Sequence, residues 1–496
     1  MAEIIAFVLY FAAVICIGVY FFTKSKSRSE KDYFLGGRKM GPWVTAMSAQ
    51  ASDMSAWLLM GLPGSILAFG LGQAWIGIGL AVGTSLNWII VAKRLRKFSK
   101  ASGDAITFPQ YLSNRFASSS PVLKIICAIV FLISFTVYVA SGFVAGTTVF
   151  TTIIPSLTPS VAMVIFVLII LVYTFLGGYK AVCWTDFFQG IMMLVALLAV
   201  PIVICITQTL DASALNAVYE YEGVKYIFNS NLFAASWQEI VSGFAWGLGY
   251  FGMPHILVRF MSIEKPSMVK KSATVAIILV ILSLGAAILI AYFGRMLIGE
   301  ELLTAGNQKL VFISLARICF PGFIAGLLLA AIIAATMSTA DSQLLVASSS
   351  FTSDIYKPII KKNNVSDKEA LWVGRLVVVV VSVIAYFIAS SKGSGAQAIM
   401  NLVENAWGLF GAAFGPVVLL SLFWKRFTYK GAVAGIVTGS LVDIIWLMAL
   451  KSTGIYEILP GFVAGLIASV IVSLLDEKPS KEILDIYDRA TSDIDD

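Results

Sequence analysis

The chain has 496 residues, of which 59% are hydrophobic and only 13% are charged, and its mean hydropathy is +0.89. Soluble domains carry about 25% charged residues, so this composition excludes a large soluble protein and indicates an all-α polytopic membrane protein. The formal net charge of +7 is compatible with nucleic-acid binding. However, the basic residues are sorted between loops on the two sides of the membrane, and this pattern excludes nucleic acid as a partner.

Apolar runs of about 20 residues, long enough to cross a bilayer, recur along the whole chain. The first, 2–22, lacks the basic residues before it and the small-residue cleavage site after it that mark a signal peptide. It is therefore expected to be a retained span with the amino terminus outside. Twelve further runs predict about 13 transmembrane helices in total: 43–66, 72–92, 121–150, 159–179, 184–208, 233–258, 272–297, 322–348, 370–390, 397–423, 431–450 and 457–475.

The distribution of basic residues tests this count. With thirteen spans, the loops on the cytoplasmic side hold 27 of the 35 Lys and Arg residues, two lie just inside span ends and six fall on the outer side. Cytoplasmic loops carry an excess of Lys and Arg, and one span more or fewer would reverse every later loop. We therefore expect one transmembrane domain over 1–476 and a short, mobile cytoplasmic tail over 477–496.

The stretch 41–64 is apolar enough to enter a bilayer but carries Asp53, flanked by serines. A carboxylate near mid-membrane costs about 2.5–3.5 kcal/mol on insertion scales and is rarely left there without a role. Gly61, Pro63 and Gly64 predict a break in the helix, and hydrocarbon cannot solvate the carbonyls that a break releases. The stretch therefore predicts one half of an ion and solute site in a secondary transporter.

A second stretch, 237–259, contains four glycines and Pro254 and is the least helix-stable of the apolar runs. It is the seventh span, five after the first interrupted one, so the two have opposite orientations. Interrupted segments in matching positions of two inverted halves indicate a transporter site. The sequence therefore predicts a 5+5 inverted repeat, with repeat one at about 43–208, repeat two at about 233–423 and two last spans outside them at about 431–475. Four aromatic residues are expected around the second break: Phe244, Trp246, Tyr250 and Phe251.

Ser338 and Thr339 place two hydroxyls in the otherwise apolar ninth span. Ala334 and Ala335, one turn earlier, are small enough to let a neighbouring helix approach closely. Hydroxyl oxygens and freed backbone carbonyls suit a hard cation such as Na⁺. Because the ninth span alone cannot supply a full shell, we expect the interrupted second span to lie beside it.

Five motifs, in order along the chain, resemble those of the sodium:solute symporter family and, within it, the bacterial sodium/proline symporters: SAQASDMSAWLLMGLPG (48–64), GGYKAVCWTDFFQG (177–190), GFAWGLGYFGMPHI (243–256), MSTADSQLL (337–345) and FWKRFTYKGAVAGIVTG (423–439). The resemblance implies the leucine-transporter-type fold in the bacterial cytoplasmic membrane. It also implies alternating access that couples inward Na⁺ movement to uptake of L-proline, with no organic cofactor and no obligate protein partner.

The resemblance further implies roles for individual residues. The sodium ligands would be main-chain oxygens and hydroxyls: Ala51, Met54, Ala335, Ser338 and Thr339. Asp53 would be the acidic residue needed for Na⁺ coupling, and we expect it to organise the helix break rather than bind the ion directly. Asp186 would lie on the inner exit route of Na⁺, and Arg38 at the inner mouth before the second span.

The resemblance also implies a set of solute-binding residues: Ser55, Ala56, Tyr138, Trp246, Tyr250 and Pro254. Ala56 stands where these symporters often have glycine. Proline is a compact ring with a secondary ammonium and a carboxylate. Aromatic faces suit the ring and attract the cation, and exposed amides at a helix break can hold the carboxylate. We expect no Arg or Lys at mid-membrane, with Arg259 in the cytoplasmic loop 259–271, and this argues against strongly anionic solutes.

Several alternatives stay open from the residues alone. A symporter of the same fold could carry another amino acid or pantothenate; a sugar is disfavoured because the seventh span is nearly free of amides. A proton-coupled carrier or a channel is a weaker alternative. An enzyme is not expected, because the sequence shows no catalytic triad or metal cluster and its one histidine, His255, is expected to be structural. Whether Glu404 and Asp443 face a cavity or a helix interface is left open, with a structural role favoured.

Overall fold

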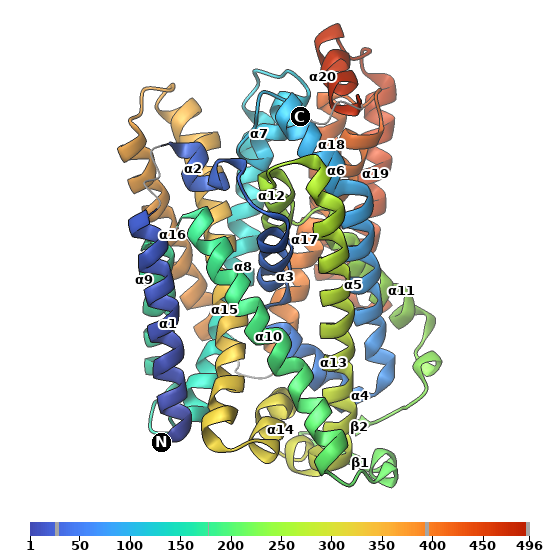
Figure 1. The fold of residues 1–496 in the computed structure, drawn as a ribbon. Coiled ribbons are helices and arrows are strands. Elements are labelled where there is room, and N and C mark those ends of the chain that lie inside the picture. Colours follow the sequence, from blue (N-terminus) through green and yellow to red (C-terminus); the bar gives the residue numbers. More distant parts are fainter. Residues whose placement is uncertain (25–28, 177, 392–395, 493–496) are drawn as a thin grey trace.

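The computed structural model describes residues 1–24, 29–176, 178–391 and 396–492. Lys392 and the last four residues of the predicted tail lie outside these ranges. Long helices run side by side between the two ends of the molecule (Figure 1). The helices are α1 (Ala2–Lys24), α2 (Glu30–Leu35), α3 (Pro42–Ala56), α4 (Leu62–Phe69), α5 (Ala74–Leu86), α6 (Lys93–Ala101), α7 (Phe108–Arg115), α8 (Val122–Ile153), α9 (Pro159–Leu176), α10 (Tyr179–Thr207), α11 (Trp237–Ala245), α12 (Pro254–Ser262), α13 (Val269–Leu303), α14 (Val311–Cys319), α15 (Gly322–Ser349), α16 (Asp367–Ser391), α17 (Ala396–Phe423), α18 (Tyr429–Ile445), α19 (Ile458–Leu475) and α20 (Lys481–Thr491).

A small antiparallel hairpin lies at the lower end in Figure 1, formed by β1 (Val218–Tyr221) and β2 (Val224–Ile227). Its two-residue turn, Glu222 and Gly223, has positive φ at both positions, as tight hairpin turns require.

Among the described residues, ten helical stretches are long and apolar enough to cross a membrane: α1, α5 with α6, α8, α10, α13, α15, α16, α17, α18 and α19. α9 is shorter in its apolar part, Pro159–Thr174. Two further apolar pairs, α3 with α4 and α11 with α12, are each interrupted. This confirms the predicted polytopic α-helical membrane protein. α15 is buried along most of its length and packs against α1, α3, α8 and α10, so it forms the centre of the fold.

The first interruption falls at Ser55, at the end of α3. Ser55 has φ 33° and ψ −179°, far from helical values, and its hydroxyl accepts the backbone N–H of Trp57 at 3.2 Å. A non-glycine residue with positive φ costs about 1–3 kcal/mol and persists only where its surroundings impose it. The chain then continues as a π-helical segment, Trp57–Gly61, and as α4.

The predicted break at Gly61, Pro63 and Gly64 is therefore wrong in position. Pro63 lies in the first turn of α4, which follows the π-helical segment without a non-helical residue between them. Gly64 packs closely instead, because a Cβ there would lie 3.1 Å from the backbone oxygen of Gln308.

The second interruption falls where the sequence predicts it. α11 starts with a capping box between Ser236 and Glu239, and a 3-10 segment, Trp246–Phe251, follows it. Met253 is extended, and Pro254 opens α12 in its first position. Phe244 is a further correction: it is 43% exposed and packs on Trp75 outside the break, because it lies on the outward face of α11.

Glycines bring the backbones of α5 and the interrupted α11–α12 pair into contact. A Cβ on Gly79 would lie 2.1 Å from the carbonyl oxygen of Gly243, and a Cβ on Gly83 would lie 2.3 Å from that of Gly247. Real Cβ atoms do not approach backbone so closely, so these positions require glycine. Close backbone approach through small residues is the usual basis of tight helix packing in membranes.

Gly83→Ala is expected to lower the free energy of unfolding by about 1–3 kcal/mol, because the added methyl group forces two backbones apart. Thermal unfolding in detergent measures the change. Gly285→Ala in α13 is the matched control, since a Cβ there meets nothing within 4 Å, and it should keep or slightly raise the midpoint. Equal midpoints for the two variants would contradict the backbone contact.

The predicted mobile tail is instead partly a helix. Ser480 caps α20 by accepting the N–H of Ile483, and Ile486 on the opposite side is buried. Lys425 forms an ion pair with Asp488 at 2.7 Å. The tail thus docks on the end of the molecule where α6 and α7 lie (Figure 1), because its amphipathic pattern finds an apolar and basic surface there.

Candidate functional site

The predicted sodium ligands on α3 and α15 meet in a chain of oxygen atoms. The Ser338 hydroxyl donates to the carbonyl of Ala51 at 2.9 Å and lies 3.2 Å from that of Ala335, while Thr339 donates to Ala335 at 3.0 Å. All of these residues are buried. Hydroxyl and carbonyl oxygens are ligands that a hard cation prefers. Met54, the fifth predicted ligand, is not bonded to these hydroxyls in the described structure; its carbonyl accepts the N–H of Trp57.

A small cavity lies next to this oxygen cluster, between the two interrupted helices. It has room for about one water molecule. Its lining is almost wholly aromatic and aliphatic: Asp53, Met54, Trp57, Leu58, Leu80, Tyr138, Trp246, Tyr250, Val280, Leu284, Val403 and Trp407. Five predicted site residues are thus brought together in its lining: Asp53, Met54, Tyr138, Trp246 and Tyr250. We call this space the solute cavity.

Asp53 connects the two interrupted helices directly. Its carboxylate accepts the hydroxyl of Tyr250 at 2.5 Å, and Asp53 is 8% exposed. Tyr250 is held in turn by Asn87, whose side-chain amide donates to the Tyr250 carbonyl at 3.0 Å. The acidic residue therefore lies two residues after Ala51 of the oxygen cluster and also on the wall of the solute cavity.

Two aromatic residues of the cavity are missing from the sequence-based prediction. Trp57 stacks on Trp246 with ring centroids 5.7 Å apart. Trp407 of α17 donates its indole N–H to the Trp246 carbonyl at 2.8 Å and packs its ring against Tyr250. A Cβ on Gly249 would collide with this indole, 2.0 Å from its nitrogen. A tryptophan within an apolar run carries no signal that separates a cavity wall from ordinary packing.

The predicted residues Ser55, Ala56 and Pro254 are buried beside the solute cavity but are not part of its described lining. Ser55 forms the break itself, Ala56 follows it with helical backbone angles, and Pro254 begins α12. These residues therefore shape the interrupted helices, and the described structure does not place them on the cavity wall.

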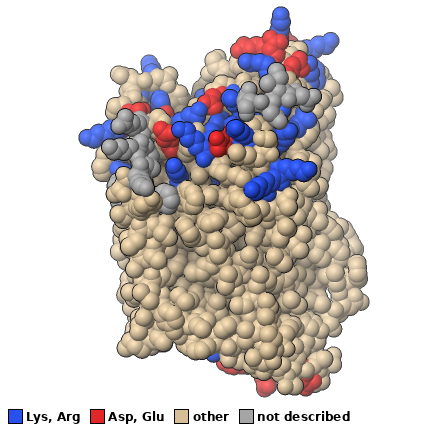
Figure 2. Space-filling model, in the orientation of Figure 1, with Lys and Arg blue, Asp and Glu red and all other residues tan. Residues whose placement is uncertain are grey.

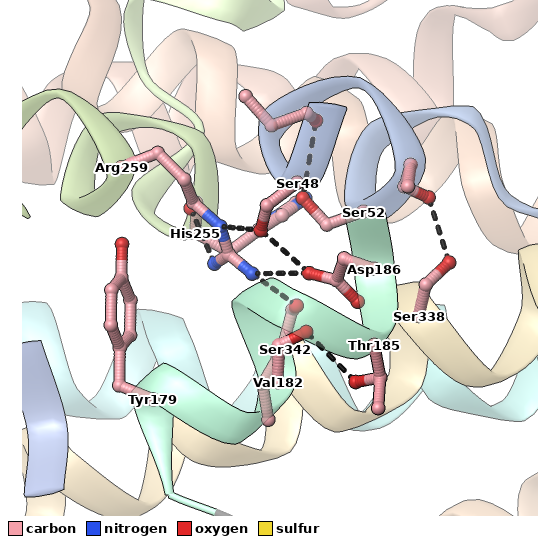
Figure 3. Close-up of polar contacts among 12 residues, drawn as sticks. Ser48, Ser52, Tyr179, Val182, Thr185, Asp186, His255, Arg259, Ser338 and Ser342 are labelled. Atoms are coloured by element: carbon pink, nitrogen blue, oxygen red, sulfur yellow. Dashed lines mark hydrogen bonds and ion pairs between the residues drawn. The ribbon is translucent and has the colours of Figure 1, made fainter. Parts of the chain in front are cut away.

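Asp186 lies in a fully buried polar cluster with Arg259 (Figure 3). Arg259 approaches the Asp186 carboxylate at 3.2 Å, and the same carboxylate oxygen accepts the Ser48 hydroxyl at 2.7 Å. Arg259 also donates to Ser48 at 3.2 Å, to the carbonyl of His255 at 2.8 Å and to Ser342. The cluster ties α3, α10, α12 and α15 together.

Arg259 corrects the sequence-based prediction. It lies inside α12 rather than in a cytoplasmic loop and is 1% exposed, so the protein interior does hold an arginine. Because Asp186 neutralises its charge, Arg259 is not free to bind an anionic solute. The sequence feature that could have placed Arg259 inside the helix is its position four residues after His255, within an apolar run.

Arg38 lies at the end of the molecule where α6 and α7 meet. It has a positive φ of 55° and donates to Asp104 at 2.7 Å, to Ser99 at 3.0 Å and to the carbonyls of Ala105 and Met261. Burial alone would raise the pKa of the Asp104 carboxyl, but hydrogen bonds from Lys31 and Arg38 outweigh it and hold that pKa below its usual value. Arg38 thus joins the loop before α3 to the end of α12.

The three residues of open or structural assignment are also buried or partly buried. His255 is fully buried, with its ring edge against Phe135 at 5.8 Å, as a packing residue would be. Glu404 lines a second cavity on the other side of Trp246, and Asp443 lies buried against Gly408.

Comparison with known proteins adds independent information. A sequence profile of the Sodium:solute symporter family matches residues 33–439. Sodium/proline symporter 2 of Staphylococcus saprophyticus is 42% identical over 495 residues, which cover 98% of this chain and 95% of that protein. The high-affinity proline transporter PutP of Bacillus subtilis is 43% identical over 467 residues, 94% of this chain and 97% of that protein.

Solved structures share the fold. An outward-open, substrate-bound Na⁺-coupled sialic acid symporter superimposes with a TM-score of 0.74 at 21% identity, over 97% of this chain and 98% of that chain. Mhp1, a nucleobase-cation-symport-1 family transporter, gives 0.54 at 15% identity over 92% and 98%. The profile match and the near full-length relatives show that this chain belongs to the sodium:solute symporter family, a family of transporters and not of enzymes.

Proposed function

We propose that this protein couples the inward movement of Na⁺ to the uptake of L-proline across the bacterial cytoplasmic membrane by alternating access. One observation carries the proposal. Ser338 contacts the Ala51 carbonyl on the same turn of α3 whose Asp53 binds Tyr250 on the wall of the solute cavity. An ion at the oxygen cluster and a solute in the cavity would therefore bind to the same interrupted helix. The names of the relatives support Na⁺ and proline as the two ligands.

We also propose that the chain crosses the membrane thirteen times. The ten continuous candidates, α9 and the two interrupted pairs together match the thirteen predicted runs. In Figure 2, Lys and Arg gather at the end where α6, α7 and α20 lie, and a broad band below them is almost free of charge on the visible face. α1 starts at the opposite end (Figure 1). This distribution supports an outer amino terminus and a cytoplasmic carboxyl terminus. The two interrupted pairs, five crossings apart, support the 5+5 inverted repeat.

The coupling is thermodynamic. Na⁺ at Ser338 and Thr339 would hold α3 against α15 and favour the arrangement in which the solute cavity is formed. Thermodynamic linkage requires that bound solute increase the affinity for Na⁺ by the same factor as bound Na⁺ increases the affinity for the solute. The membrane potential adds about 2.3 kcal/mol per charge per 100 mV to the driving force, so the solute can accumulate.

Uptake of labelled L-proline into proteoliposomes tests the proposal. We expect concentrative uptake with an inward Na⁺ gradient and none when K⁺ replaces Na⁺. A competition panel of other amino acids and pantothenate tests the solute. Uptake driven equally well by a proton gradient without Na⁺ would contradict the sodium site.

Ser338→Ala is expected to raise the Na⁺ concentration for half-maximal uptake by about tenfold, because one oxygen ligand worth roughly 1.4 kcal/mol is lost. The rate at saturating Na⁺ should change less. Ser349→Ala on the same helix is the control, since among the described residues its hydroxyl bonds the Val346 carbonyl within its own helix. An unchanged Na⁺ dependence in Ser338→Ala would remove Ser338 from the ion site.

A further inference from the structure

A second cavity, the outer cavity, lies next to the solute cavity and shares Trp246 with it. Ser242 of α11, Glu404 of α17 and Tyr456 in the connection between α18 and α19 contribute to its lining. α18 begins next to Lys425, which pairs with the tail helix on the basic face. Its other end and this connection therefore lie toward the opposite, outer side. The Trp246 side chain is the partition between the two cavities.

Tyr456 covers Trp246 from the outer cavity. Their ring centroids are 5.0 Å apart and the ring planes differ by 34°. On the side of the solute cavity, Trp246 stacks on Trp57 at 5.7 Å. Tyr456 is 4% exposed and Trp246 is 4% exposed, so this aromatic stack is closed to solvent in the present arrangement.

The connection that carries Tyr456 is fastened to two other helices. The Tyr456 hydroxyl donates to the Glu404 carbonyl at 2.7 Å, and its backbone N–H donates to the Ser242 hydroxyl at 3.0 Å. The Ser242 hydroxyl donates in turn to the carbonyl of Gly454 at 3.2 Å. α18 and α19 lie outside both proposed repeats, yet their connection is bonded to α11 and α17 beside the solute cavity.

We propose that residues 454–457 form an outer lid over the solute cavity and that Tyr456 is its positioning residue, which holds Trp246 in the closed arrangement. This inference rests on the proposed transport function for its purpose but not for its geometry. A solute that enters from outside has to displace Trp246. Tyr456 opposes that displacement through ring contact, and its hydroxyl bond to Glu404 adds to the stability of the closed state. Loss of that one bond should shift the equilibrium toward the open state by roughly fivefold.

The test measures how fast the solute cavity opens to the outside. Leu80→Cys, on the wall of the solute cavity and 5% exposed, serves as the probe. A membrane-impermeant methanethiosulfonate reagent is added to intact cells, and peptide mass spectrometry separates this cysteine from the five native ones. We expect slow modification with Tyr456 present, roughly fivefold faster modification with Tyr456→Phe, and faster still with Tyr456→Ala. Tyr456→Phe keeps the ring and therefore the packing. It still tests the lid if the alanine variant fails to fold.

Tyr111→Phe is the control, because it removes another buried tyrosine hydroxyl, bonded to Ser421 at 2.8 Å, on the basic side. It should leave the modification rate unchanged. If Tyr456→Phe modifies at the unaltered rate, the lid is overturned even where proline uptake is normal. If modification accelerates as expected but the unaltered protein does not take up proline, the lid stands and the proposed solute falls.

Discussion

Asp53→Asn is expected to lower the efficiency of Na⁺-driven proline uptake by on the order of 100-fold. Among the described residues that line the solute cavity, Asp53 alone carries a charge. Hydrogen bonds to charged groups contribute about 1.5–3 kcal/mol each, and the carboxylate would also set the local field for a cation at the proposed sodium site, two residues away. Asparagine has nearly the same shape and can still accept the Tyr250 hydroxyl, so the fold should persist. Initial uptake rates in proteoliposomes, compared at equal protein, measure the loss.

Tyr250→Phe is the matched variant for this experiment. It removes the hydroxyl that donates to Asp53 at 2.5 Å but keeps both the charge and the aromatic wall. We expect a smaller loss than with Asp53→Asn. If Asp53→Asn retained normal uptake and normal Na⁺ dependence, the coupling role of the carboxylate would be refuted.

Arg259→Gln is expected to lower the free energy of unfolding by about 3–5 kcal/mol, because it leaves the fully buried Asp186 carboxylate without its ion-pair partner. Asp186→Asn alone should also destabilise the fold, because it leaves the buried Arg259 without its ion-pair partner. The double variant Asp186→Asn/Arg259→Gln removes both charges and should recover most of the loss. Thermal unfolding of the four proteins in detergent forms a double-mutant cycle.

Arg317→Gln is the control for a pair of similar chemistry in an exposed setting. Arg317 contacts Glu3 at 2.8 Å, with side chains 38% and 20% exposed. Solvent screens such a pair, and its loss should cost less than about 1 kcal/mol. A double variant less stable than either single variant would contradict the interpretation of the Asp186–Arg259 pair as mutual neutralisation.

Composition and local periodicity were enough to predict the helices and one of the two interruptions. Apolar runs and their flanking basic residues are dictated by the bilayer, so the helices fall where the runs are. The glycines and Pro254 predicted the interruption between α11 and α12, because proline and glycine act locally on the backbone. Ser338 was placed near the second span because the ninth span alone cannot supply a full shell of oxygen ligands, and in the structure its hydroxyl donates to the Ala51 carbonyl.

The features that the sequence did not predict depend on tertiary contacts. The positive φ of Ser55 is imposed by its surroundings. Serine has no backbone preference for positive φ, so the sequence does not predict it. Arg259 looks like a loop residue until Asp186 is placed beside it. Trp407 looks like packing until its indole N–H is seen on the Trp246 carbonyl. The contacts of the tail helix with α6 and with Lys425 join segments far apart in the sequence.

Alternating access requires parts of the molecule to move against each other, and the glycine contact restricts which parts these are. Gly79 and Gly83 come from the first proposed repeat, and Gly243 and Gly247 from the second. Helices that touch backbone to backbone have no layer of side chains between them that could repack during a sliding motion. α5 and α11 are therefore expected to travel together, as one unit assembled from both repeats. The surfaces that shear during transport then do not follow the boundary between the two proposed repeats; they are expected where side chains, rather than bare backbones, meet.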